Sequence, residues 1–157
     1  MAMAELTPGV EAPQFTLPAD GGGTVRLAEL RGKIVVLFFY PQDNTETCTA
    51  EAIDFSRYHD AFKAAGAVVL GISPDSLKKH ANFRKKHGLT TPLVADEARE
   101  AIEAYGVWGE KTMFGRKYMG VIRSTFLIDR AGKIARIWRN VRVSGHAEEV
   151  LESAKAL

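Results

Sequence analysis

The residues best suited to chemistry lie in one short stretch, Pro41-Gln-Asp-Asn-Thr-Glu-Thr-Cys48. Cys48 is the only cysteine in the 157-residue chain. It follows an apolar run that predicts a buried strand, and it lies where a helical pattern begins. A helix N-terminus offers unpaired N–H groups and partial positive charge, which favour a thiolate over a thiol. Because the thiolate is the nucleophile, this position predicts a reactive sulfur.

The neighbours of Cys48 fit that prediction, and each also has an ordinary structural interpretation. Thr45 and Thr47 carry hydroxyls that can donate to a thiolate or to a polar substrate, but they are equally suited to cap a helix. Pro41 fixes φ and can shield one side of the loop, or it simply ends the strand. Glu51, three residues after Cys48, is placed to orient a cation. A lone cysteine is itself often an inert buried residue, so none of these signals is decisive alone.

Two other uses of the cysteine are poorly supported. The chain has no C-x-x-C pair, so it cannot act as a dithiol catalyst. None of the four histidines lies near Cys48 in the sequence, so metal ligation has little support. We therefore expect no metal and no cofactor.

Composition narrows the class of protein. Hydrophobic residues make up 46% and charged residues 25%, which is typical of one globular domain, expected over residues 1–157. A net charge of +2 argues against a nucleic-acid partner. The longest apolar run, Ile34–Tyr40, is too short to span a membrane. Without a signal-peptide pattern or a disulfide framework, the cytoplasm is the expected location.

The hydrophobic pattern predicts alternating strands and helices. Strands are expected on both sides of a turn at Pro18–Thr24, and at Lys33–Tyr40, Ala67–Ile72, Thr91–Val94, Thr125–Asp129 and Lys133–Trp138. Helices are expected from the Cys48 region to a stop at Gly66, from a Ser73 cap with Pro74 at its first position to His87, over Asp96–Gly106, and from a Ser144 cap to Leu157. This order predicts a three-layer α/β domain whose first two core strands are parallel.

Several segments together resemble a known family. The pattern P-x-x-x-T-x-x-C at residues 41–48 resembles the active-site segment of peroxiredoxins. The segments "LGISPDS", "YGVWGEK", "RSTFLID" and "VRVSGHAEEVL" resemble the bacterioferritin comigratory protein, or PrxQ, subgroup, and they occur in the expected order along nearly the whole chain. The resemblance implies a peroxiredoxin fold, which is thioredoxin-like with an N-terminal extension.

The resemblance also implies roles for four residues. Cys48 matches the peroxidatic cysteine that attacks a hydroperoxide and becomes a sulfenic acid. Thr45 matches the threonine that positions the peroxide, and Pro41 matches the proline that shields the site. Arg123 matches the arginine that stabilises the thiolate and the peroxide oxygens. Residue patterns alone do not single out Arg123 from 21 basic residues.

The chain departs from the subgroup where relatives carry a second, resolving cysteine. Those positions are Ile53 and about Ala81 here. The sulfenic acid must therefore meet an external thiol, from thioredoxin or from glutaredoxin and glutathione, or a second copy through Cys48. Slow resolution leaves the cysteine open to over-oxidation. Glu46 also places a negative charge near the thiol, which disfavours the thiolate.

The expected function is that of a thiol-dependent peroxidase of the one-cysteine type, acting on hydrogen peroxide and organic hydroperoxides in antioxidant defence. The alternative is a stoichiometric redox sensor that uses the same cysteine. A disulfide carrier is disfavoured because the second cysteine is missing. The expected partners are a hydroperoxide and an external reductant, with no nucleic acid and no membrane, and the expected state is a monomer or weak homodimer.

Three further features keep two interpretations each. The basic stretch Lys78–Gly88 either docks an acidic reductase or a phosphate, or is the solvated face of a helix. Trp108 and Phe114 either border the peroxide pocket or are ordinary packing residues.

Overall fold

The fold is built around a strand whose two faces are both buried. The computed structural model describes residues 6–157. In β3 (Ile34–Phe39) every residue is buried, as the continuous apolar run predicts. Val35, Leu37 and Phe39 face one hydrophobic cluster, whereas the alternate residues Ile34, Val36 and Phe38 face the other. This period of two places β3 at the centre of three layers.

Seven of the described strands form one sheet in the order β2-β1-β5-β4-β3-β8-β9, and β6 pairs with β7 outside it. β3 runs parallel to β4, which runs parallel to β5, whereas β8 lies antiparallel to β3. The predicted parallel pairing of the first two core strands is thus confirmed. The remaining strand bounds are Thr16–Ala19 (β1), Gly23–Arg26 (β2), Ala67–Ser73 (β4), Leu93–Ala95 (β5), Trp108–Met113 (β6), Arg116–Val121 (β7), Ser124–Ile128 (β8) and Ile134–Arg139 (β9).

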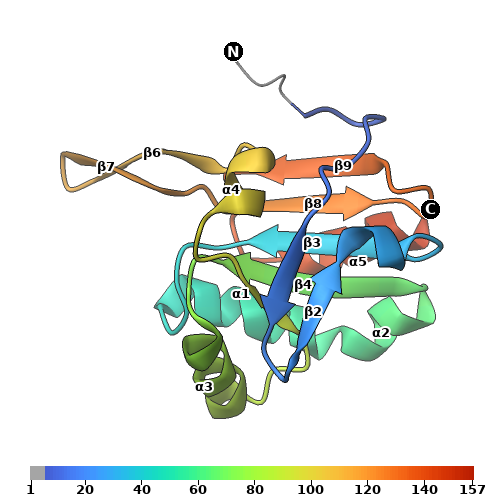
Figure 1. The fold of residues 1–157 in the computed structure, drawn as a ribbon, viewed down its shortest axis with the longest axis horizontal. Coiled ribbons are helices and arrows are strands. Elements are labelled where there is room, and N and C mark those ends of the chain that lie inside the picture. The colour runs from blue at the N-terminus through green and yellow to red at the C-terminus, as the bar shows by residue number, and fades with distance from the viewer. Residues whose placement is uncertain (1–5) are drawn as a thin grey trace.

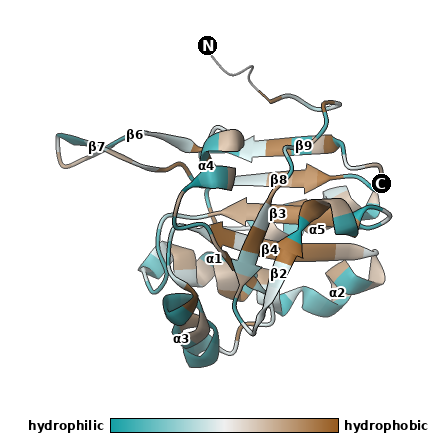
Figure 2. Ribbon diagram, viewed as in Figure 1, coloured by the Kyte–Doolittle hydropathy of each residue, from teal (hydrophilic) through white to brown (hydrophobic). Residues whose placement is uncertain are grey.

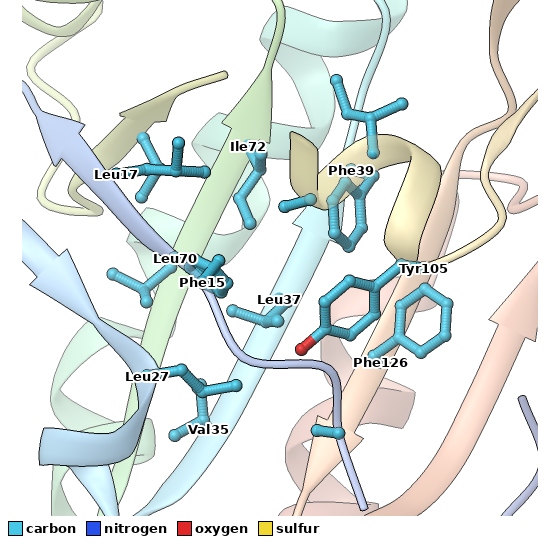
Figure 3. Close-up of a cluster of buried hydrophobic side chains, with 14 of the residues drawn as sticks. Phe15, Leu17, Leu27, Val35, Leu37, Phe39, Leu70, Ile72, Tyr105 and Phe126 are labelled. Carbon is cyan, nitrogen blue, oxygen red and sulfur yellow. The ribbon is translucent and has the colours of Figure 1, made fainter. Parts of the chain in front are cut away.

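Helices cover both faces of the sheet (Figure 1). The described helices are η1 (Leu27–Leu30), α1 (Glu46–Arg57), α2 (His59–Ala64), α3 (Leu77–His87), α4 (Glu100–Ala104) and α5 (His146–Lys155). One core cluster joins the N-terminal segment, η1 and α4 to the sheet, and Tyr105 packs there against Phe39 and Phe126 (Figure 3). The other cluster joins α1, α2, α3 and α5 to the opposite face. The central strands β3, β4 and β8 are the most hydrophobic part of the ribbon (Figure 2).

Several predicted helix boundaries are wrong. The helix expected to run from the Cys48 region to Gly66 is two helices, because Tyr58, with a ψ of 15°, interrupts the helical backbone. Ser76, not Ser73, caps α3, since its Oγ accepts from the Lys79 N–H, and Pro74 lies before the helix. Ser144 does not cap α5. The N-cap residue is Gly145, whose backbone is in the left-handed region. Gly88 ends α3 as predicted.

Two further bounds shift for local reasons. β5 begins at Leu93 rather than at Thr91. α4 begins only at Glu100, because the Asp96 carboxylate accepts from the N–H groups of Glu100 and Ile102 and so starts the helix later than the hydrophobic pattern suggests. No helix within residues 6–157 is long and apolar enough to cross a membrane.

The sequence pattern did not predict the hairpin of β6 and β7. These two strands pair from Trp108 with Val121 to Met113 with Arg116. The hairpin extends away from the main sheet, at the end of the molecule opposite the C-terminus (Figure 1).

Candidate active site

Cys48 lies where the sequence predicts, in the first turn of the helix that follows β3. Thr45 flanks the start of α1 with extended backbone angles, and Cys48 is the third helical residue. The side chain packs with the cluster beneath α1 and is 1% exposed. The sulfur is therefore at the positive end of a helix and largely shielded from water.

Arg123 contacts the sulfur directly. It lies between β7 and β8, and its Nη2 donates to Cys48 Sγ at 3.1 Å. Its Nη1 donates to Glu51 Oε1 at 2.7 Å. Glu51 lies one helical turn after Cys48, so both acceptors are on the same face of α1. The guanidinium therefore bridges the thiol and the carboxylate, and Glu51 orients the cation as its spacing from Cys48 predicts.

This ion pair is buried, and its surroundings shift the pKa values of both groups. Glu51 is 1% exposed. Burial raises the pKa of Glu51 to about 7, although the charge and hydrogen bond of Arg123 oppose the rise. Burial alone would lower the pKa of Arg123, but Glu51 and Cys48 outweigh it and the net shift is upward. Arg123 is thus a permanent cation beside the sulfur, held by a carboxylate that titrates near neutral pH.

Glu51 Oε2 has no hydrogen-bond partner among the residues that the structure describes. An unpaired buried carboxylate oxygen is costly in its ionised form, which is consistent with the upward shift of the Glu51 pKa.

A cavity of about 490 Å³ brings the four predicted site residues together. Pro41, Thr45, Cys48 and Arg123 all line it, and so does Trp108, whereas Phe114 does not. The Thr45 hydroxyl donates to the Gln42 carbonyl at 2.9 Å, so its lone pairs are left to accept a hydrogen bond from a ligand in the cavity. The opposite wall comes from the hairpin and is formed by Lys111, Met113, Tyr118, Met119, Gly120 and Val121.

Lys111 is a site residue that the sequence reasoning missed. Its Nζ donates to the Val121 carbonyl at 3.0 Å across the hairpin, and the side chain lines the Cys48 cavity. Burial lowers the pKa of Lys111, Arg123 lowers it further, and Cys48 opposes the shift. A second cation thus faces the sulfur. Nothing in the sequence marks it, because its placement depends on the unpredicted hairpin.

A buried polar cluster holds the loop that leads to Cys48. Asp43 accepts from the Tyr40 hydroxyl at 2.6 Å, and its Oδ2 lies 2.7 Å from His80 Nδ1. His80 Nε2 lies 3.0 Å from the Val94 carbonyl. Both ring nitrogens thus lie within hydrogen-bonding distance of an oxygen, Nδ1 of the Asp43 carboxyl group and Nε2 of the Val94 carbonyl. The cluster fastens the residues just before the Cys48 helix to α3.

The same cluster includes the described residues best placed to hold a metal ion. Ligand-type atoms of Asp43, Asp75 and His80 lie within 4.8 Å of one another. Each is already bonded within the protein: Asp75 Oδ2 accepts from the Ser73 hydroxyl and the Asp43 N–H, and Asp43 pairs with His80. The contacts therefore describe a hydrogen-bonded brace, and the site chemistry rests on the thiol instead.

Comparison with known proteins places this geometry in a family. The model of the AhpC/TSA family matches residues 8–137. The chain is 46% identical to the peroxiredoxin Bcp of Bacillus subtilis over 147 residues, which covers 94% of each protein. It is 39% identical to the peroxiredoxin Bcp of Escherichia coli, covering 98% of each.

Solved structures give the same result. The structure of Xylella fastidiosa PrxQ superimposes with a TM-score of 0.92 at 37% identity, covering 98% of each chain. The bacterioferritin comigratory protein of Xanthomonas campestris gives 0.86 at 41% identity, covering 90% of each.

The chain belongs to the AhpC/TSA family of thioredoxin-like peroxidases. Within that family it is a peroxiredoxin of the Bcp/PrxQ branch, and it has one cysteine. The predicted peroxiredoxin fold is confirmed, and membership implies thiol peroxidase activity.

Proposed function

We propose that the protein reduces hydrogen peroxide and organic hydroperoxides with Cys48 alone and relies on an external thiol for recycling. The observation that carries the proposal is the contact of Arg123 Nη2 with Cys48 Sγ at 3.1 Å, inside a cavity that Thr45 and Pro41 also line. In this scheme the Cys48 thiolate attacks the distal peroxide oxygen. The O–O bond breaks, the sulfur becomes a sulfenic acid, and the other oxygen leaves as water or an alcohol after taking a proton.

Each of the residues around Cys48 has a separate role in that step. Negative charge moves from sulfur onto the departing oxygen, and the Arg123 guanidinium stabilises both positions. The Thr45 hydroxyl accepts a hydrogen bond from the peroxide and orients it. Pro41, which is half-buried and has no N–H, limits the access of water. The apolar side of the cavity suits the carbon chain of an organic hydroperoxide; the relative from Xanthomonas campestris is described as reducing alkyl peroxides.

Recycling needs two thiols from outside the chain. By the family resemblance, the positions at which relatives carry a resolving cysteine are Ile53 and about Ala81 in this chain, and neither is cysteine. A first thiol displaces water from the sulfenic acid and forms a mixed disulfide with Cys48. A second thiol then attacks the sulfur of the first thiol in the mixed disulfide. This releases the Cys48 thiolate and joins the two external thiols in a disulfide. Thioredoxin and glutaredoxin with glutathione are the proposed reductants, and cytoplasmic antioxidant defence is the proposed setting.

The test compares wild type with Cys48→Ser and Arg123→Lys. One equivalent of hydrogen peroxide should convert wild type to a sulfenic acid or mixed disulfide detectable by mass, and thioredoxin or glutaredoxin with glutathione should then support many turnovers. Cys48→Ser should be inert. Arg123→Lys keeps the charge but not the forked geometry, so its rate of oxidation should fall by about 10²-fold. Oxidation of wild type without turnover with any thiol would instead favour the redox-sensor function.

A further inference from the structure

The hairpin of β6 and β7 presents large apolar side chains to water. Phe114 is 98% exposed, Met113 55%, Met119 53% and Tyr118 41%. Met113 and Phe114 lie at the turn of the hairpin, whereas Tyr118 and Met119 lie farther along β7. These four residues are called the apolar hairpin residues below. The hairpin itself projects from the main sheet (Figure 1). Single exposed apolar residues are ordinary, but four on one protruding element are typical of an interaction site.

The conformation of the turn between β6 and β7 is unusual for a phenylalanine such as Phe114. Met113 pairs with Arg116, so the turn consists of Phe114 and Gly115, whose φ angles are 52° and 77°. A two-residue turn with positive φ at both positions favours Asn-Gly or Asp-Gly, because bulky residues are strained there. The chain instead has a phenylalanine that is both strained and almost fully hydrated. Packing within the protein does not account for it, which points to a partner.

Three of the apolar hairpin residues lie beside the route to the reactive sulfur. Met113, Tyr118 and Met119 line the cavity that contains Cys48. Cys48 itself is 1% exposed, so while α1 stays folded a reductant reaches Sγ through this cavity. A protein that delivers a thiol by this route therefore meets the hairpin.

The charge of the hairpin indicates which surface such a protein would present to it. The stretch from Lys111 to Met119 contains Lys111, Arg116 and Lys117 and no acidic residue. The neighbouring Glu110 offsets one of these cations through a 3.7 Å ion pair with Lys117. The complementary surface is apolar near its own cysteine and acidic at its rim.

We propose that the hairpin of β6 and β7 is the docking surface for the protein that reduces Cys48, namely a dithiol protein with an apolar patch beside its reactive cysteine and an acidic rim. The proposal rests on the external recycling proposed above. The partner thiolate attacks the sulfenic Sγ, the S–O bond breaks, and the hydroxide takes a proton and leaves as water. The partner's second thiolate then attacks the partner's sulfur in the mixed disulfide. Cys48 leaves as the thiolate, and the partner is oxidised to a disulfide.

Phe114→Asn gives a sharp test because asparagine is favoured in this turn. The variant should fold at least as stably as wild type, react with hydrogen peroxide at the same rate, and turn over normally with dithiothreitol. With reduced thioredoxin as the electron donor, its KM for thioredoxin should rise about tenfold, the effect of losing one large apolar contact. The double variant Arg116→Ala/Lys117→Ala should raise the same KM and reduce its dependence on salt.

Leu157→Ser is the matched control. Leu157 is 46% exposed and lies at the opposite end of the molecule, so its loss should leave the KM for thioredoxin unchanged (Figure 1). An unchanged KM in Phe114→Asn, or an equal loss with thioredoxin and dithiothreitol, would overturn the docking proposal. Wild type that turns over with dithiothreitol but with neither thioredoxin nor glutaredoxin would also overturn it while leaving the peroxidase function intact. Failure with every thiol would instead refute the recycling on which it rests.

Discussion

Replacing Glu51 by glutamine should remove a pH dependence of folding stability that the buried ion pair creates. Burial raises the pKa of Glu51 from 4.5 to about 7. Between these two values the folded protein holds a proton that the unfolded chain has released, so the free energy of unfolding falls as pH rises. At about 1.4 kcal/mol per pKa unit the full effect is about 3 kcal/mol, of which about 2.5 kcal/mol falls between about pH 5 and pH 8. Glutamine keeps an oxygen that accepts from Arg123 but has no proton to lose.

Urea denaturation of wild type and Glu51→Gln at about pH 5 and pH 8 measures this effect. Relative to wild type, the variant should gain about 2.5 kcal/mol of stability on going to the higher pH. Subtracting the two proteins cancels the titration of the other groups that they share. A stability difference that is the same at both pH values would refute the reasoning, because it would mean that Glu51 is ionised throughout and fully paired with Arg123.

Two other substitutions test the packing and the brace of the site. In Gly71→Ala the new Cβ would lie 2.7 Å from Phe38 Cζ and 3.0 Å from Leu93 Cδ2, so thermal denaturation should show a loss of about 1–3 kcal/mol, whereas Gly23→Ala, with nothing within 4 Å, should show little change. His80→Ala removes a fully buried ring and leaves the Asp43 carboxyl group and the Val94 carbonyl without that partner. It should lower the free energy of unfolding by about 3–5 kcal/mol, against less than about 0.5 kcal/mol for exposed Lys86→Ala. A loss of stability in Gly71→Ala no larger than in Gly23→Ala would contradict the close packing at Gly71. A loss in His80→Ala no larger than in Lys86→Ala would contradict the role of the brace.

The sequence predicts the central strands well, because their signal is local and strong. The run at residues 34–39 has no polar residue, and Gly32 and Pro41 bound it, so a doubly buried strand is the simplest interpretation. Cys48 follows at a fixed distance, which places the thiol at a helix start without any tertiary information. Helix caps are harder. "SPDS" offers two serines three residues apart, and Ser73 hydrogen-bonds to Asp75 at the end of β4, which leaves Ser76 to cap α3.

The rest of the site depends on contacts that no local pattern encodes. Arg123 reaches Cys48 across 75 positions of the chain, and only the family resemblance identified it. The β6–β7 hairpin escaped prediction because its usual signal is altered: phenylalanine stands where a two-residue turn normally has asparagine or aspartate. Phe114, which removes the usual turn signal from the sequence, is also the residue whose strain and exposure indicate that the hairpin binds a partner.

The interruption at Tyr58 has a consequence for how the site opens. α1 and α2 meet there without a continuous helical backbone, so α1 can open separately from α2. Its buried residues Cys48, Glu51, Ala52 and Phe55 anchor it to the core. Unwinding α1 exposes the sulfur to a large reductant while α2 and its anchor Phe62 stay folded. Amide hydrogen exchange should therefore divide at Tyr58, with protection over α1 that differs from protection over α2.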